Sequence, residues 1–172
     1  MNAYEQCPIL TTKSFILRLV STEDSDALFD CYGDEEAVRF MNDDNCDFGF
    51  LMHSREQMRQ TIDYWLDFYE KRGFIRFSVT DRESGKAVGT IEGFGGETGV
   101  LRVDMARQYE KEKFLRELFD AATDNFKEIF ANEYLVTKAV PEAVERRKAL
   151  NACGWEYISE YKGYPEYYCV KI

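Results

Sequence analysis

The sequence has few of the residues from which metal and redox sites are built. It contains one histidine, His53, and no Cys-x-x-Cys pair. A structural zinc ion needs four Cys or His ligands held close together, so we expect no zinc site. An odd, scattered set of thiols without a secretory signal is typical of a reduced, cytoplasmic protein. The cysteines are Cys7, Cys31, Cys46, Cys153 and Cys169.

The chain is also poor in basic residues and in long apolar runs. It carries 22 Lys and Arg against 32 Asp and Glu, a net charge of −10 at pH 7. This balance argues against a nucleic-acid partner and against an anionic membrane surface. No apolar run approaches the roughly 20 residues that span a bilayer. P-loop and nucleophile-elbow motifs are absent as well.

What the sequence does contain is the composition of a folded domain. Its 172 residues are 45% hydrophobic and 15% aromatic, which excludes disorder and suffices for a substantial core. It has no internal repeat and no Pro- or Ser-rich linker, so we expect a single domain over residues 1–172. Both a monomer and a homodimer are consistent with the pattern.

Strand and helix patterns alternate along the chain. Ser21 or Thr22 and Ser54 are predicted N-caps, and Gly73 and Gly154 are predicted helix ends. The expected helices are 21–32, 36–41, 54–72, 114–130 and 141–154, with Pro141 at the start of the last. The expected strands are 15–20, two within 74–95 around a turn at 83–85, 99–106, 133–139, 155–161 and 166–172, the last two joined by a turn near Gly163 and Pro165.

Without the short segment 36–41, this order reads β-α-α-β-β-β-α-β-α-β-β. A three-strand meander followed by β-α-β predicts an α/β fold with a mixed sheet and helices on both faces. Residues 42–53 carry turn-forming residues and are expected to be a loop.

Three stretches resemble a known family in the same order and at the same spacing. They are LTTKSFILRLVSTEDSDALFDCYGDEEAVRFM, FSVTDRESGKAVGTIEGFG with Gly89 in the family's glycine position, and KAVPEAVERRKALNACGWE. From about Leu10 to the C-terminus the chain resembles the GNAT superfamily of acetyl-CoA-dependent N-acetyltransferases. Within it, the chain resembles the branch that includes the ribosomal-protein N-terminal acetyltransferases.

The resemblance implies a place for each reactant. Acetyl-CoA would lie in a V-shaped opening between two parallel strands, here 99–106 and 133–139. Its pyrophosphate would sit on the loop and helix start that follow the first strand. An amine would attack the thioester directly, while a base or a water chain takes its proton and a tyrosine often protonates the thiolate. The pantetheine arm would pair with the backbone of Asp104, Met105, Ala106 and Arg107.

The sequence departs from the family at the pyrophosphate loop. Lys111, Lys113 and Leu115 stand where the family tends to have glycine or another small residue, and their side chains can crowd the phosphates. Two interpretations stay open: Arg107, the lysines and Arg116 supply charge in place of lost backbone contacts, or they are a solvated helix start. The residues assigned here to the cofactor are Arg107, Lys111, Glu112, Lys113, Phe114 and Leu115.

A second departure lies in the helix 141–154. Where the family commonly has Asn, Ser and the thiolate-protonating Tyr, this chain has Ala143, Arg146 and Leu150, and Leu150 has no proton to give. Ala143 and Arg146 are therefore cofactor-side positions only by alignment. These departures together suggest that acetyl-CoA binding or turnover is weakened or lost.

Glu92 and Asp104 are the candidate general bases. A carboxylate that faces a partly buried cleft can have its pKa raised toward working pH. The alternative is that both are outward-facing sheet residues. The acidic residues within 42–47 either attract a cationic amine or keep a loop in water, and we favour the second. Three tyrosines of the closing hairpin either reach the cleft or simply pack: Tyr164, Tyr167 and Tyr168.

The sequence thus predicts an N-acetyltransferase that moves acetyl from acetyl-CoA to a primary amine of a small molecule or a protein N-terminus. The alternative is a GNAT-fold binding or interaction module that no longer turns over acetyl-CoA. The enzyme prediction stands if the two parallel strands splay and the N–H groups of the loop converge. It fails if Phe114 or the lysine stems fill that space. The acceptor side falls on 42–53 and 160–166.

Overall fold

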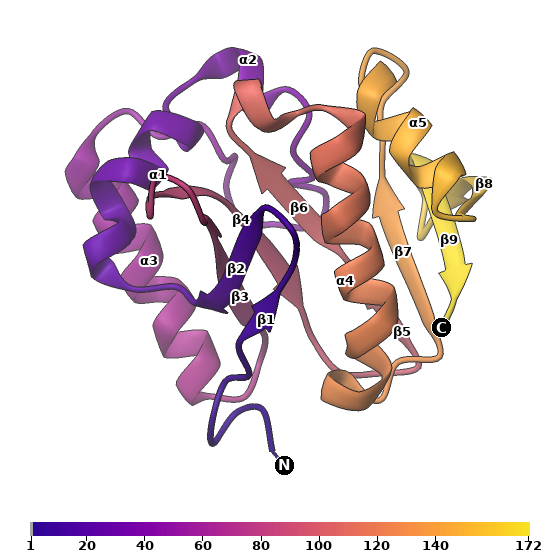
Figure 1. Ribbon diagram of the computed structural model, residues 1–172, viewed down its shortest axis with the longest axis horizontal. Coiled ribbons are helices and arrows are strands. Elements are labelled where there is room, and N and C mark those ends of the chain that lie inside the picture. Colours follow the sequence, from indigo (N-terminus) through magenta and orange to yellow (C-terminus); the bar gives the residue numbers. More distant parts are fainter. Residues whose placement is uncertain (1) are drawn as a thin grey trace.

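Helices and strands alternate along the computed structural model, which describes residues 2–172 (Figure 1). The strands are β1 (Leu10–Thr11), β2 (Phe15–Leu19), β3 (Ile75–Asp81), β4 (Ala87–Gly93), β5 (Thr98–Val100), β6 (Arg102–Met105), β7 (Tyr134–Lys138), β8 (Glu156–Tyr161) and β9 (Tyr164–Lys171). The helices are α1 (Ser25–Tyr32), α2 (Glu35–Val38), α3 (Arg55–Glu70), α4 (Glu112–Phe130) and α5 (Val144–Ala152), with short 3-10 turns η1 (Thr22–Asp24) and η2 (Arg107–Tyr109).

The predicted helix starts and stops are confirmed at several positions. Ser21 and Asp24 form a capping box: the Ser21 side chain accepts a backbone N–H of the first helical turn, and the Asp24 carboxylate accepts the N–H of Ser21. The Ser54 hydroxyl accepts the N–H of Gln57 at 3.1 Å, and the Gln57 side chain binds the N–H of His53 at 2.7 Å. Gly154 adopts a positive φ of 78° just after α5, as expected for a glycine that ends a helix.

Several predicted boundaries are wrong. The expected strand 99–106 is divided into β5 and β6. Helix α4 begins at Glu112, two residues earlier than expected. Helix α5 begins at Val144, because the residues from Pro141 form a turn that the Ala143 N–H closes onto Val140 O at 3.0 Å. In the closing hairpin the turn contains Gly163, but Pro165 already belongs to β9.

The strands form two sheets that separate between β6 and β7. The first has the order β1-β2-β3-β4-β6 and the second β5-β7-β9-β8. Every pairing is antiparallel except β5 with β7. Helices α1 and α3 lie against one face of the first sheet, and α4 covers its other face (Figure 1). The predicted α/β fold with a mixed arrangement and helices on both faces is therefore confirmed.

The two faces of the first sheet differ in chemistry although both are buried. The face toward α4 carries the apolar side chains Ile75, Phe77, Val79, Ile91, Val103 and Met105. The face toward α1 and α3 carries Arg76, Ser78, Thr90, Glu92, Arg102 and Asp104, each less than 9% exposed. Buried ionised groups must be paired, so this polar face determines where the charged site forms.

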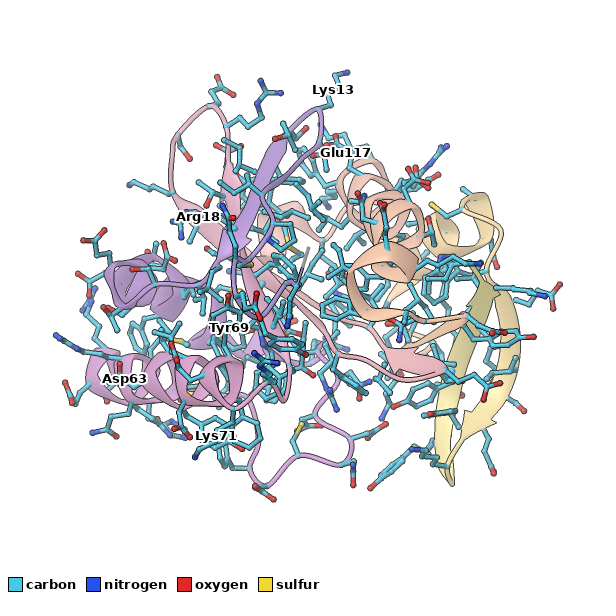
Figure 2. All side chains as sticks on the ribbon, turned by 90° about the horizontal axis from the view of Figure 1, so that it is seen from below. Lys13, Arg18, Asp63, Tyr69, Lys71 and Glu117 are labelled. Atoms are coloured by element: carbon cyan, nitrogen blue, oxygen red, sulfur yellow. The ribbon has the colours of Figure 1, made fainter. Side chains whose placement is uncertain are left out.

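Helix α4 is fixed against the sheet by one carboxylate. Glu117 accepts hydrogen bonds from the Thr12 hydroxyl at 2.7 Å and from the Ser14 N–H and hydroxyl, both at 2.8 Å. Figure 2 shows Glu117 next to the β1–β2 turn that carries Lys13. Because Glu117 lies near the start of α4 and a helix is rigid, this contact also fixes the position of the N-terminus of α4.

Within residues 2–172, no helix is long and apolar enough to cross a bilayer. The same part of the chain brings together no group of three or more His, Cys, Asp or Glu side chains that could hold a metal ion.

Candidate active site

The two sheets open from each other at Leu101. Strand β5 pairs in parallel with β7 through Val100, and the Leu101 N–H still donates to Val136 O at 2.8 Å. The Thr137 hydroxyl then donates to Leu101 O at 2.8 Å, after which β6 turns away and pairs with β4. The predicted splay between two parallel strands is therefore present, and it begins at Leu101.

Gly89 sets how closely β4 approaches β6 beside this opening. A Cβ atom on Gly89 would lie 2.2 Å from the Asp104 carbonyl oxygen and 2.6 Å from the Met105 sulfur. No side chain fits at such distances, so a glycine is required here. The edge of β6 that pairs with β4 is thereby saturated, and its opposite edge faces the gap toward β7.

A cavity of about 680 Å³ lies on the side of the opening away from α4. Its walls come from the loop before α3, from α3, from β4 to β6 and from the β8–β9 hairpin, and more than half of its lining residues are aromatic. This volume is typical of a small-molecule site. The aromatic residues of its walls include Phe48, Tyr64, Phe68, Phe74, Tyr164 and Tyr167.

A charged network forms the polar wall of this cavity. Arg76 donates to Glu92 at 2.6 Å and to Asp104 at 2.9 Å, and Arg102 donates to the other oxygen of Glu92. The Arg76 guanidinium also stacks on Trp65, 4.5 Å from a ring centroid, a cation–π contact that stabilises the buried charge. Glu92, Arg76 and Arg102 all line the cavity, so the network forms part of its wall.

Asp104 lies deeper than Glu92 and does not line the cavity. Its side chain is fully buried and accepts from the Tyr32 hydroxyl at 2.8 Å as well as from Arg76. Burial raises the pKa of Asp104, although Arg76 and Tyr32 oppose the shift. The alternative that Glu92 and Asp104 point outward is wrong, because they are only 4% and 0% exposed.

The loop before α3 is tied to the same wall. The Asn42 amide donates to the Tyr167 hydroxyl at 3.1 Å, and Lys138 of β7 binds both oxygens of Asp44 at 2.8 Å. Burial raises the pKa of Tyr167 to about 12. The expectation that the acidic residues merely keep this loop in water is wrong for Asp44, whose carboxylate closes an ion pair between the loop and the second sheet.

The predicted pyrophosphate loop leads into the N-terminus of α4. Lys111 is the N-cap but offers no side-chain acceptor; instead the Glu112 N–H donates to the Glu145 carboxylate of α5 at 3.0 Å. This hydrogen bond lowers the pKa of Glu145. Arg107 is exposed and pairs with Asp34 at 3.2 Å. A hollow of about 600 Å³ lies here, lined by Gln108, Lys111, Glu112, Lys113, Phe114, Arg116 and Glu145.

Neither Phe114 nor Leu115 fills this hollow. Phe114 packs back onto Phe15 and Tyr109, with ring centroids 5.6 and 5.2 Å apart, and Leu115 is fully buried in the core. The Lys113 ammonium lies 4.5 Å from the Phe114 ring centroid. The aromatic ring therefore supports a lysine at the rim of the hollow.

Arg146 does not face solvent or a cavity. It is 1% exposed, and its Nε and Nη2 atoms bind the two carboxylate oxygens of Glu110 at 2.7 and 2.8 Å. Ala143 and Leu150 are buried as well. The resemblance predicted that Arg146 lies on the cofactor side. Its guanidinium instead pairs with Glu110 in the loop that leads into α4, because a buried charge requires a partner of opposite sign.

Sequence reasoning missed most of the charged network. The missed residues are Tyr32, Asn42, Arg76, Arg102, Glu110, Lys138 and Glu145. One signal was available: if helices cover both faces of a sheet, charged residues at alternate strand positions are buried too. Two basic and two acidic residues on that face must then pair.

Comparison with known proteins identifies the fold and the family. A family model described as an acetyltransferase (GNAT) domain matches residues 14–156. The uncharacterized N-acetyltransferase YoaA of Bacillus subtilis is 31% identical over 84 residues, which span 49% of this chain and 44% of that protein. The chain thus matches less than half the length of this curated relative.

Two solved structures have the same fold at low sequence identity. RimL, a ribosomal L7/L12 alpha-N-protein acetyltransferase in complex with coenzyme A, superposes with a TM-score of 0.75 at 10% identity, over 96% of this chain and 98% of that one. The ribosomal-protein-S5-alanine acetyltransferase of Vibrio fischeri gives 0.73 at 12% identity, over 95% and 96%. Since the family model covers most of the chain, this protein belongs to the GNAT acetyltransferase domain family.

Proposed function

We propose that the protein transfers an acetyl group from acetyl-CoA to the primary amine of a small molecule. The observation that carries this proposal is the parallel pair β5–β7, which splits at Leu101 beside a cavity with Glu92 on its wall. A donor in the split and an acceptor in the cavity would meet where β6 begins.

The residues at the start of α4 fit the phosphates of acetyl-CoA. The Glu112 N–H already holds a carboxylate at 3.0 Å, and a helix N-terminus that holds one anion suits another. Lys111, Lys113 and Arg116 line the same hollow as Glu112. These cations would hold the pyrophosphate, and the free edge of β6 from Asp104 would hold the pantetheine arm. When bound, acetyl-CoA supplies a thioester that an amine can attack.

Glu92 is the residue proposed to take the proton of the acceptor ammonium. It lines the cavity, and its carboxylate is held in place by Arg76 and Arg102. Asp104 does not reach the cavity, so its proposed role is that of the counter-ion that positions Arg76. Tyr167 lines the same cavity, and its hydroxyl is proposed to protonate the departing thiolate.

Acetyl-CoA binding is the first expected result. Calorimetric titration should give a dissociation constant in the micromolar range, about −8 kcal/mol. Ligand at about 100 times that constant should stabilise the fold by roughly 2.7 kcal/mol. The variant Lys111→Ala/Lys113→Ala should bind about tenfold more weakly, because two cations near the phosphates are lost.

Lys71→Ala is the matched control, because Lys71 follows α3 and lies outside the hollow. Its affinity should equal that of the unaltered protein. No heat and no thermal shift at millimolar acetyl-CoA would reject the enzyme proposal and leave a GNAT fold kept as a binding module.

The aromatic walls favour an acceptor with an aromatic body. Tyr64, Phe68 and Phe74 form a continuous series with centroids 4.7 and 5.0 Å apart, and Phe48 meets Tyr64 at 5.8 Å. We expect the protein to release coenzyme A from acetyl-CoA faster with 2-phenylethylamine as acceptor than with a linear alkylamine of equal carbon number. Phe48→Ser should raise the KM of the aromatic amine about tenfold, because apolar contact area is lost.

Ile9→Ser serves as the control for Phe48→Ser. Ile9 is also an exposed apolar residue but lies outside this cavity, so its replacement should leave KM unchanged. Equal rates with aromatic and linear amines, or a faster rate with an N-terminal peptide, would exclude the aromatic acceptor class.

A further inference from the structure

The N-terminus of α4 already carries an anion supplied by another helix. Glu145 belongs to the first turn of α5, 33 residues beyond Glu112 in the chain, and its Oε2 atom accepts the Glu112 N–H at 3.0 Å. The N-cap Lys111 makes no side-chain cap. The carboxylate therefore supplies the capping acceptor that Ser, Thr, Asp or Asn normally provides at the N-cap itself.

The residue after Glu145 fixes this arrangement. Arg146 binds Glu110 through two hydrogen bonds of 2.7 and 2.8 Å and is almost completely buried. Two consecutive residues of α5 thus bind the loop on both sides of Lys111. Because the bidentate pair restrains the backbone of α5, the Glu145 side chain remains within reach of the helix terminus.

Glu145 also separates two hollows in the surface. It lines the hollow of about 600 Å³ around Lys111 and Lys113, and it lines a second one of about 220 Å³ formed with Glu142 and Val144. Lys111 is the other residue that lines both. A phosphate that binds the Glu112 N–H must take the place of the Glu145 carboxylate, and a ligand that extends from one hollow to the other must push it aside.

A second partner for the Glu145 carboxylate lies nearby. The Lys148 ammonium lies 3.5 Å from the other carboxylate oxygen of Glu145, one turn further along α5. The carboxylate can leave the Glu112 N–H by rotating toward Lys148 without leaving its charge unpaired. The contact is therefore one that a stronger anion can replace.

We propose that Glu145 is an internal competitor of the cofactor, a carboxylate that occupies the phosphate position at the start of α4 and sets the affinity for coenzyme A. This inference rests on the proposed function. In the free protein the carboxylate caps α4; in the complex the pyrophosphate replaces it, and Glu145 pairs with Lys148. In place of the open, glycine-lined phosphate loop that is usual in the family, this chain thus has a helix N-terminus that the Glu145 carboxylate occupies until the ligand binds.

The test is the affinity of coenzyme A for two variants of Glu145. Glu145→Ala removes both the charge and the acceptor, so it should bind coenzyme A about tenfold more tightly, equivalent to about 1.4 kcal/mol. Glu145→Gln keeps an acceptor but loses the charge, so its dissociation constant should fall between those of the alanine variant and the unaltered protein. Calorimetry measures both without reference to turnover.

Glu142→Ala is the matched control. Glu142 is exposed, lies three residues away and lines the smaller hollow, so its removal changes the local charge equally without freeing the Glu112 N–H. Its affinity should change less than twofold. Without ligand, hydrogen exchange at the Glu112 amide should be faster in Glu145→Ala and unchanged in Glu142→Ala.

The failure of this inference differs from the failure of the proposed function. If the unaltered protein binds coenzyme A and Glu145→Ala binds it equally or more weakly, the competitor role is rejected while the enzyme proposal stands. If Glu142→Ala tightens binding as much as Glu145→Ala, only the general charge matters and the role is again rejected. If no variant binds coenzyme A, both proposals fall.

Discussion

Replacing Arg146 by alanine is expected to lower the free energy of unfolding by about 3–5 kcal/mol. The side chain is 1% exposed and neutralises Glu110, which is itself 8% exposed. Without the guanidinium, the Glu110 carboxylate stays in a poorly hydrated place with no cation, and two charge-assisted hydrogen bonds are lost. Urea unfolding followed by circular dichroism measures the difference.

Two further variants isolate the cause of this loss. Arg116→Ala removes an arginine whose ion pair with Glu112 is long, at 3.9 Å, and exposed, so it should change stability by no more than about 0.5 kcal/mol. The double variant Arg146→Met/Glu110→Leu removes both charges and should recover most of the loss. A loss below about 1 kcal/mol for Arg146→Ala would mean that Glu110 is hydrated once its partner is gone.

The largest expected effect on activity comes from Glu92→Gln. The glutamine keeps the volume of the side chain but cannot take a proton, so kcat/KM for the acceptor amine should fall about 100- to 10,000-fold. The dissociation constant of acetyl-CoA should change little, because Glu92 lies outside the hollow at the start of α4. Steady-state release of coenzyme A measures the first quantity and calorimetry the second.

Glu97→Gln controls for the loss of one negative charge. Glu97 is exposed in the segment between β4 and β5 and lies outside the cavity, so its variant should retain full activity. The thermal midpoint of Glu92→Gln should be recorded too, since Arg76 and Arg102 lose part of their counter-charge. A folded Glu92→Gln protein with more than a tenth of the original kcat/KM would exclude Glu92 as the general base.

The pyrophosphate loop is a region where the sequence predicted the position of the site and only the structure showed its contacts. The sequence identifies a phosphate loop without glycines and leaves open whether its lysines bind phosphate or solvent. The structure places Lys111, Lys113 and Arg116 around one hollow. It also adds Glu145, which no local pattern could connect to Glu112, because the contact depends on how α5 packs against α4.

The sequence by itself determined the order of the main helices and strands, the cap at Ser54, the chain reversal near Gly163 and the family. These follow from interactions within a few residues or from word order along the chain. Only the tertiary structure decided the break at Leu101, because β5 takes its partner from a strand more than 30 residues away. It also decided the pairing of Arg76 with Glu92, because the register of two paired strands determines which buried charged residues lie opposite each other.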